Sequence, residues 1–522
     1  MSVSLGSLGT KTSCSLRHHG NHSHSHSHSH SHSHSHSHSH SHSHSGVLKN
    51  TRLMTMASSS SSSTTAAALQ VTSLELPPPL TSTTPGTWAY DTMSRRVLEN
   101  IVQGTVVADN EHLLDNAARG RISLLEAELA NAAETKLEHI LHHANGENET
   151  SSNDEKAWRQ LMQPYVERGD TWLSAPWLVT EFYLYRRILH ATGYFDAKAP
   201  LHLHDPFALQ KKKGLAACAS AMSSLAPRVN AFAAADFGDD LDAKSDQLRL
   251  FVMLSLWGNR MDLSIWPSEG DGAASSARAA KAVEAALAES ASNLLHDDAD
   301  NAMKVIVNAR RVDIVVDNAG FELVTDLALA DALACAGGEG ACVTLRVKGH
   351  PTYVSDVILE DVFETIDTLA ASKEEAVAAM ATRWKTHMRS GRWVVAPHDY
   401  WAQGFPFWTM PEDVVAAVSG ADAVILKGDA NYRRLLGDLQ WPLSTPFAEV
   451  AGYMPAPTLA LRTLKAELGC GMAEDRVAYA KAESDDWMVS GRFGVVQFWE
   501  GVGAGESCAS VRAARTKEYF TM

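Results

Sequence analysis

The sequence has few cysteines and no long hydrophobic run, and both absences restrict the kind of protein it can be. Its six cysteines are scattered, and none belongs to a Cys-x-x-Cys pair. A disulfide framework or a structural zinc site is therefore not expected, and a reducing compartment fits best. No apolar run approaches the roughly 20 residues that a membrane-spanning helix needs. We expect a soluble protein of the cytoplasm.

Acidic residues are missing from the first 74 positions, where residues 22–44 alternate histidine with serine and residues 58–63 are all serine. Such low complexity predicts a disordered Ser/His-rich tail over residues 1–85. The repeat is either a weak metal buffer, since imidazole is a common ligand, or a simple-sequence expansion without a selected role. The acid-poor, serine-rich composition also resembles an organellar transit peptide, although the Arg-rich amphipathic helix of such peptides is missing.

Basic residues are outnumbered in the rest of the chain. The formal net charge is -16, and the first 74 residues carry four basic and no acidic side chains, so residues 75–522 hold -16 - 4 = -20. This charge argues against nucleic acid or an anionic membrane as a partner. The hydrophobic share of 45% is sufficient for a sizeable core.

Residues 86–245 are predicted to form a helical domain. Apolar residues recur at three- and four-residue spacing over Met93–Val107, Asn110–Ala133 and Trp177–Leu189. The aromatic stripe of the third segment is typical of a core. Within it, Glu181 and Arg186 either line a pocket or form a structural ion pair.

Residues 246–500 are predicted to form an α/β domain, followed by a C-terminal tail over residues 501–522. Strand-like runs are Lys304–Asn308, Val312–Asp317, Ala341–Val347, Arg392–Ala396, Ala423–Leu426, Thr458–Leu461 and Gly494–Trp499. Helical patterns between them are Glu322–Ala336, Lys373–Arg389 and Pro411–Ser419. This alternation predicts a mostly parallel sheet with helices on both faces.

Several motifs of known chemistry are absent. Neither Gly-x-Ser-x-Gly nor His-Glu-x-x-His occurs, which disfavours a serine hydrolase and a zinc protease. Gly501-Val-Gly-Ala-Gly505 imitates a nucleotide-binding turn, but only 17 residues follow it, too few for the returning crossover. We expect a loop there.

Polar clusters stand where predicted strands end, and they suggest a metal site. Asp317 and Asn318 stop a β-branched run, and Asp356 ends a second short run. The carboxyl ends of parallel strands face one edge of a sheet, so these side chains can converge. Two carboxylates and an amide oxygen suit Mg²⁺ or Mn²⁺. The alternative is that each Asp caps a turn or helix. Asn259 and Asp262 follow another apolar run and either join this edge or are turn and cap residues.

A further cluster, Lys427-Gly-Asp-Ala-Asn431, offers what an anionic substrate needs. Lys427 supplies charge, Gly428 allows close backbone approach, and the helix starting near Asp429 presents free N–H groups. Arg462 and Lys465 follow the next strand and could hold the same phosphate. A divalent metal beside a phosphate site implies phosphoryl chemistry.

At these residues the chain resembles the metal-dependent damage-control phosphatases, in the subgroup that carries an Arg-Thr-x-Lys motif and includes the acidic residue methyltransferase, or sugar phosphate phosphatase. The matching motifs are Trp257-Gly-Asn-Arg-Met-Asp-Leu-Ser264, Asp317-Asn-Ala-Gly-Phe-Glu-Leu323, Val354-Ser-Asp356, Lys427-Gly-Asp-Ala-Asn-Tyr-Arg433, Arg462-Thr-Leu-Lys465 and, in the helical part, Pro176-Trp-Leu-Val-Thr-Glu-Phe-Tyr-Leu-Tyr-Arg186.

The resemblance implies a helical N-terminal domain on a Rossmann-like three-layer α/β/α domain. It implies hydrolysis of small phosphorylated sugars such as fructose 1-phosphate and fructose 6-phosphate, with Mn²⁺ as the metal or Ni²⁺, Co²⁺ or Mg²⁺ in its place. Metal ligands would be Asp317, Asn318 and Asp356. Substrate contacts would come from Asp317, Asn318, Lys427, Gly428, Asp429, Ala430, Asn431 and Lys465. Ala430 departs from the leucine usual in the family.

Asp317 and Asn318 would be the catalytic residues, and either an aspartate or a metal-bound water would attack the phosphorus. Two other functions stay open: an S-adenosylmethionine-dependent protein-glutamate carboxyl methyltransferase, for which no glycine-rich first turn is evident, and a non-catalytic metal-binding protein. The sequence leaves open the physiological substrate, the preferred metal, the oligomeric state, the role of the repeat and whether translation starts at Met54 or Met56.

Overall fold

The computed structural model describes residues 75–140, 153–238, 240–258, 291–501 and 506–522. These residues belong to one compact unit, Leu69–Met522. Most of the predicted tail, Asn259, Asp262 and most of the glycine-rich segment after Gly501 lie outside the described residues. No helix in the described part of the chain is both long and apolar enough to cross a membrane.

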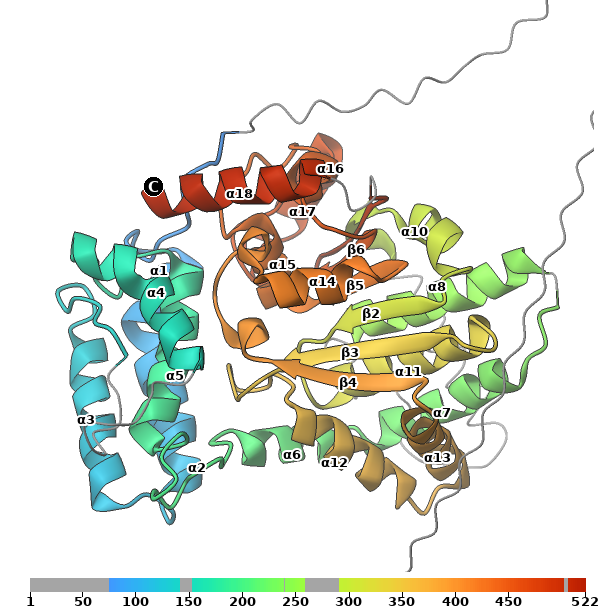
Figure 1. The fold of residues 1–522 in the computed structure, drawn as a ribbon, viewed down its shortest axis with the longest axis horizontal. Helices are drawn as coiled ribbons and strands as arrows, with labels where there is room; N and C mark the ends of the chain where they lie inside the picture. Colours follow the sequence, from blue (N-terminus) through green and yellow to red (C-terminus); the bar gives the residue numbers. More distant parts are fainter. Residues whose placement is uncertain (1–74, 141–152, 239, 259–290, 502–505) are drawn as a thin grey trace, which may run out of the picture. The chain divides into compact units, whose positions relative to one another are not determined.

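A seven-stranded sheet forms the centre of the α/β part (Figure 1). Its spatial order is β1 (Leu294–Asp297), β7 (Gly494–Trp499), β6 (Thr458–Thr463), β5 (Ala423–Lys427), β2 (Arg311–Val315), β3 (Cys342–Lys348) and β4 (Trp393–His398). All neighbouring strands are parallel except β6 and β7. The predicted α/β class and mostly parallel sheet are confirmed.

Alternate residues of the central strands supply two separate cores, one on each face of the sheet. In β5, Ile425 packs into one apolar cluster, whereas Val424 and Leu426 pack into the other. In β2, Ile314 and Val315 divide in the same way. Strands buried on both faces read as continuous apolar runs, which is why these two strands were evident in the sequence.

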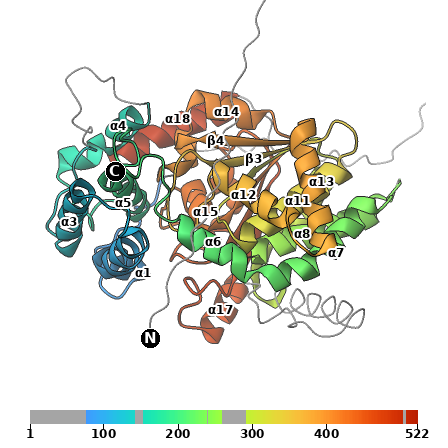
Figure 2. The same ribbon diagram turned by 90° about the horizontal axis from the view of Figure 1, so that it is seen from below.

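Helices cover both faces. The core on the Ile425 face is built with α6 (Ala208–Ala217), α7 (Ala219–Ala234), α8 (Leu241–Trp257), α10 (Ala299–Ile306), α11 (Phe321–Ala336), α12 (Leu359–Ala370) and α13 (Glu375–Ser390). The other face is covered by two 3-10 turns (Asp399–Ala402 and Phe407–Thr409) and by α14 (Glu412–Ser419), α15 (Gly428–Leu436), α16 (Phe447–Ala451), α17 (Glu474–Glu483) and α18 (Glu506–Thr521). Figure 2 shows α6, α7, α8, α11 and α12 on one side of β3 and β4, with α14 on the other. The result is a three-layer α/β/α arrangement.

The N-terminal helices have an apolar core of their own. It is formed by α1 (Trp88–Asp91), a wide π-type helix η1 (Thr92–Val107), α2 (Ala108–Asn110), α3 (Asn116–Ala130), α4 (Asn153–Arg168) and α5 (Trp177–Thr192). Fourteen of the 16 residues of α5, including Trp177, Phe182 and Tyr183, are buried. The helical N-terminal region is confirmed, and the aromatic stripe of α5 is core.

Three local predictions were wrong. Lys304–Asn308 is no strand; it overlaps the end of α10, because Ala302, Met303 and Ile306 form a helical face packed against the sheet. The predicted domain boundary between residues 245 and 246 falls inside α8 (Leu241–Trp257) and does not separate two elements. The polar C-terminal residues form α18, which buries Tyr519. Strand β1 was missed because only two of its four residues are apolar.

Candidate active site

Asp317, Asn318 and Asp356 meet at the carboxyl edge of the sheet. Asp317 and Asn318 follow β2, and Asp356 lies in the loop between β3 and α12. Asn318 and Asp356 face each other in an isolated antiparallel bridge, and the Val357 N–H donates to the Asp317 carbonyl at 2.9 Å. Backbone pairing therefore holds the two carboxylates and the amide in one place.

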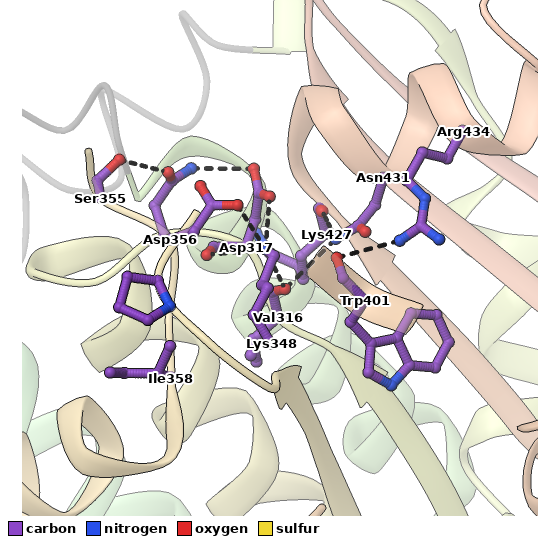
Figure 3. Close-up of polar contacts among 12 residues, drawn as sticks. Val316, Asp317, Lys348, Ser355, Asp356, Ile358, Trp401, Lys427, Asn431 and Arg434 are labelled. Carbon is purple, nitrogen blue, oxygen red and sulfur yellow. Dashed lines mark hydrogen bonds and ion pairs between the residues drawn. The ribbon is translucent and has the colours of Figure 1, made fainter. Parts of the chain in front are cut away.

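Lys348, the last residue of β3, lies between the two carboxylates (Figure 3). Its Nζ is 3.1 Å from Asp317 Oδ1 and 3.0 Å from Asp356 Oδ2, and it also donates to the Val316 and Asp317 carbonyls at 3.2 Å. The sequence analysis missed Lys348. The same signal that marked Asp317, a polar residue at the end of an apolar run, could have found it.

The electrostatics of this cluster favour a cation. Burial raises the pKa of Asp356 to about 7, the charge of Asp317 adds to the rise, and Lys348 opposes it. Burial by itself would lower the pKa of Lys348, but the charges of Asp356 and Asp317 outweigh it and raise that pKa. Two buried carboxylates so close together need a compensating positive charge, which Lys348 provides here.

Asn318 connects the cluster to a third carboxylate. Its Nδ2 donates to Asp317 Oδ2 and to Glu322 Oε2, both at 3.0 Å, and its Oδ1 accepts from Ser355 Oγ at 2.6 Å. Glu322 lies in the first turn of α11 and is buried, and burial raises its pKa. Glu322 was quoted only within the resembling motif and was not predicted as a site residue.

Lys427 and Gly428 approach the cluster from the end of β5. Gly428 has φ +83°, and a β-carbon there would overlap the Asp317 carboxylate. The Lys427 ammonium is buried, donates to the Ser255 carbonyl, and lies 3.2 Å from Asp326 and 3.9 Å from Glu322. It therefore lies beside the carboxylates of α11, and it does not contact Asp317 or Asp356 directly.

Two other predicted phosphate residues, Asn431 and Asp429, form hydrogen bonds that hold neighbouring segments of the chain in position. Asn431 Nδ2 donates to the Lys427 carbonyl at 2.9 Å and to the Val316 carbonyl at 3.3 Å, which joins the ends of β5 and β2. Asp429 Oδ1 accepts from Arg462 Nε at 2.7 Å and from the Lys465 N–H at 3.2 Å.

Arg462 is not free to bind a phosphate. It is fully buried, and its two terminal nitrogens donate to the carbonyls of Leu468 and Ala466. Each of its three side-chain nitrogens thus donates to the loop that carries Lys465 or to Asp429, and the prediction of a phosphate contact from Arg462 is corrected accordingly.

A cavity of about 340 Å³ opens over the cluster. From the α/β part it is lined by Asp317, Asn318, Tyr353, Val354, Ser355, Asp356, Asp429, Ala430, Arg433, Lys465 and Val489. From the helical region it is lined by Trp88, Thr92, Arg96, Val97, Asn100, Ile101, Trp177, Glu181 and Tyr185. Its volume is at the lower end of the roughly 300–1,000 Å³ of small-molecule sites. The cavity therefore suits a small polar ligand.

The two candidates on α5 have different roles. Glu181 lines the cavity, and its Oε2 accepts from Arg433 Nη1 at 2.8 Å and from the Tyr353 hydroxyl at 2.9 Å. Arg186 forms a buried ion pair with Asp154 at 2.7 Å and is absent from the cavity lining. Both interpretations of Glu181 thus hold, whereas Arg186 has the structural role.

A second group of metal-ligating side chains lies elsewhere, on α11 and α13. One ligand atom each of Asp331, Cys335 and His387 lies within 4.8 Å of the other two, a spacing that could hold a metal ion. The Asp331 carboxylate, however, already accepts from Arg383 at 2.5 Å and from His387 at 2.9 Å. A guanidinium bound to the central ligand competes with a metal, so the observed contacts are those of a buried ion-pair network.

Comparisons with known proteins agree with the resemblance in the motifs. Residues 108–479, more than half of the chain, match the family described as damage-control phosphatase ARMT1-like domain. The damage-control phosphatase ARMT1 of Danio rerio is 31% identical over 368 residues, covering 67% of this chain and 80% of that protein. The human protein of the same name is 29% identical over 364 residues, covering 66% and 80%.

Among solved structures, a Pyrococcus horikoshii protein of the duf89 family is 14% identical, with a TM-score of 0.35, covering 61% of this chain and 88% of that one. That likeness is too low to add to the argument. The match over residues 108–479 is sufficient by itself: the chain belongs to the damage-control phosphatase ARMT1-like family.

Proposed function

We propose that the protein is a metal-dependent phosphatase that hydrolyses small sugar phosphomonoesters such as fructose 1-phosphate or fructose 6-phosphate. The observation that carries the proposal is the buried pair Asp317 and Asp356, which holds a cation, Lys348, at the wall of a small cavity. Membership of a phosphatase family supports the proposal. So does the ammonium group of Lys465, which lines the same cavity.

The side chains at this edge fit a divalent metal. Asp317, Asp356 and Asn318 offer hard oxygen donors, which suit Mn²⁺ best in this proposal and Ni²⁺, Co²⁺ or Mg²⁺ as alternatives. Asp356 Oδ2 is buried without a hydrogen bond of good geometry, although the Lys348 charge lies beside it. When bound, the metal would supply charge neutralisation for the phosphoryl oxygens and acidify a water molecule.

The chain's own residues then bind and orient the ester. We place the phosphate between Lys465, the first backbone N–H groups of α15 at Asp429 and Ala430, and the Asp317 edge, because helix N-termini and ammonium groups attract phosphate. Gly428 leaves room for Asp317, and Asn431 fixes the strand ends. Lys427 does not contact the phosphate in this arrangement. Its charge acts on the neighbouring carboxylates of Glu322 and Asp326.

The test is phosphate release from fructose 1-phosphate with Mn²⁺, comparing wild type with Asp317→Ala and with Asp367→Ala. Asp367 is a matched control because it is an exposed aspartate that pairs with Lys385 away from the cavity. We expect Asp317→Ala to lose at least about 100-fold in rate, as expected for a group at the reacting centre, and Asp367→Ala to remain active. Equal rates for wild type and Asp317→Ala would refute the proposal.

We also propose that the chain divides into a helical domain and an α/β domain, but at an earlier boundary than the one predicted between residues 245 and 246. Leu215 of α6 and Met222 and Val229 of α7 pack into the core of the sheet, although they lie within the predicted helical domain. We therefore place the boundary near residue 207, with α6 and α7 assigned to the α/β part.

A further inference from the structure

Two cations in the cavity wall form no close ion pair within the described part of the chain. Arg433, the third cation in its wall, is paired with Glu181 and Asp438 at 2.8 Å each. Lys465 and Arg96 line the same cavity, and neither forms an ion pair within the described part of the chain. In a chain with 61 acidic and 45 basic residues, a shortage of carboxylates does not explain two unpaired cations in one small cavity.

Arg96 is held in place by an aromatic ring. Its guanidinium lies 3.9 Å from the centre of the Trp88 ring, and its Nη1 is 3.4 Å from Thr92 Oγ1, one turn earlier on the same helix. Stacking on an indole fixes the plane of a guanidinium while leaving most of its N–H groups available to a ligand. The side chain is therefore oriented before any ligand binds.

The wall that carries Arg96 is attached to the loop that carries Lys465. The Trp88 N–H donates to both oxygens of Glu467, at 3.4 and 3.3 Å, and Glu467 lies two residues after Lys465. The Lys465 N–H donates to Asp429 Oδ1 at the start of α15, whereas Arg96 belongs to η1. Lys465 thus lines the cavity from the α/β part and Arg96 from the helical region.

We propose that Arg96 is a specificity-determining residue, which binds a second anionic group, a phosphate or a carboxylate, on the phosphomonoester substrate. The inference rests on the proposed function and adds a preference within it: among small sugar phosphates, those with a second acid are bound more tightly than singly phosphorylated sugars such as fructose 6-phosphate. A planar guanidinium binds both kinds of oxyanion through two parallel hydrogen bonds. A neutral sugar hydroxyl would leave its charge uncompensated in a half-enclosed site.

The experiment compares three substrates that differ in the second group: fructose 6-phosphate, fructose 1,6-bisphosphate and 6-phosphogluconate. Arg96→Ala should lower kcat/KM by about 10- to 100-fold for the two doubly anionic compounds, chiefly through KM, since charged hydrogen bonds of this kind contribute that much to binding. Fructose 6-phosphate should change by less than about threefold, which also shows that the variant folds. Arg96→Lys should recover part of the loss.

Arg95→Ala is the matched control. Arg95 is the preceding residue of the same helix, but its side chain is about half exposed and pairs with Asp91 and Glu99 outside the cavity. It should leave all three rates unchanged. If only one of the two doubly anionic compounds responds to Arg96→Ala, that response identifies the second group. Equal loss with all three compounds, or no loss with any, would overturn the inference.

Calorimetric binding of 6-phosphogluconate to wild type, Arg96→Ala and Arg95→Ala separates this inference from the proposed function. Weaker binding to Arg96→Ala alone, in a protein that releases no phosphate from any of the compounds, would keep the second-anion site and refute the phosphatase. Phosphate release with unchanged binding to Arg96→Ala would refute the site and keep the phosphatase.

Discussion

The Asp317 carboxylate occupies the space that a β-carbon would take at Gly428. The glycine has φ +83°, and it follows Lys427 directly at the end of β5. Its role is therefore steric as well as conformational: it lets β5 and the start of α15 approach a side chain from the end of β2. The contact couples the predicted phosphate segment to the predicted metal ligand.

Gly428→Ala should consequently displace Asp317 and lower kcat for phosphate release by about 100-fold, the effect of moving a reacting group by roughly 1 Å. Gly391→Ala is the control, because Gly391 has φ +75° but a β-carbon there meets no atom within 4 Å. It should cost stability by about 1–2 kcal/mol through backbone strain and leave kcat unchanged. Full activity of Gly428→Ala would contradict this account.

Lys348→Met should make stability depend on metal. Removing one partner of a buried ion pair costs about 3–5 kcal/mol, since the other charges stay buried and unpaired. Urea unfolding with and without Mn²⁺ measures the effect, and Mn²⁺ should restore much of the lost stability by replacing the ammonium charge between Asp317 and Asp356.

The control for Lys348→Met is Lys211→Met. Lys211 is another buried lysine between two carboxylates, Asp205 at 2.8 Å and Asp361 at 2.7 Å. Its removal should destabilise the protein equally with and without Mn²⁺. Rescue of both variants, or of neither, would argue against a metal at Asp317 and Asp356.

Asp326 should make stability fall as pH rises. Burial raises its pKa to about 7, Glu322 adds to the rise, and Lys427 opposes it. Between about pH 4, near the ordinary pKa of an aspartate, and pH 7, the folded state holds a proton that the unfolded state has lost. This contribution to stability is therefore present at low pH and is lost towards pH 7. In Asp326→Asn the contribution should be absent. Urea unfolding of wild type and of Asp326→Asn at pH 5 and pH 8 measures how much the free energy of unfolding changes between the two pH values. The same change in both proteins would contradict the prediction.

Cys335→Ser should leave both bound metal and activity unchanged. Although Cys335 lies close to Asp331 and His387, burial raises the pKa of its thiol to about 11, so the thiolate needed for metal binding is disfavoured. Elemental analysis of the purified protein measures metal content. A loss of stoichiometric metal in Cys335→Ser, but not in Asp356→Ala, would move the metal centre to α11 and α13.

The sheet and its edge were predictable because their signals are local. Buried parallel strands such as β2 and β5 are apolar runs, and the residue that stops each run stands at the carboxyl edge of the sheet. Asp317 could therefore be found without coordinates. The failure at Lys304–Asn308 has the opposite cause: five residues are too few to separate a strand from one face of a helix.

The helical wall of the cavity could not be predicted. Arg96 lies some 220 positions before Asp317 in the sequence, and its amphipathic helix gives no sign of which surface faces the sheet. Lys427 shows a second limit: its place after a strand was evident, but the contact with Asp326 depends on how α11 packs. Side-chain partners across distant elements are decided by tertiary packing, which sequence periodicity does not encode.

The most direct test is an anomalous-scattering map of a crystal soaked in Mn²⁺. The account predicts a single strong peak among the side-chain oxygens of Asp317, Asn318 and Asp356, with the Lys348 ammonium moved away from one or both carboxylates. A peak at Asp331 and His387, or no peak beside Asp317 in a crystal that has taken up Mn²⁺ elsewhere, would contradict it.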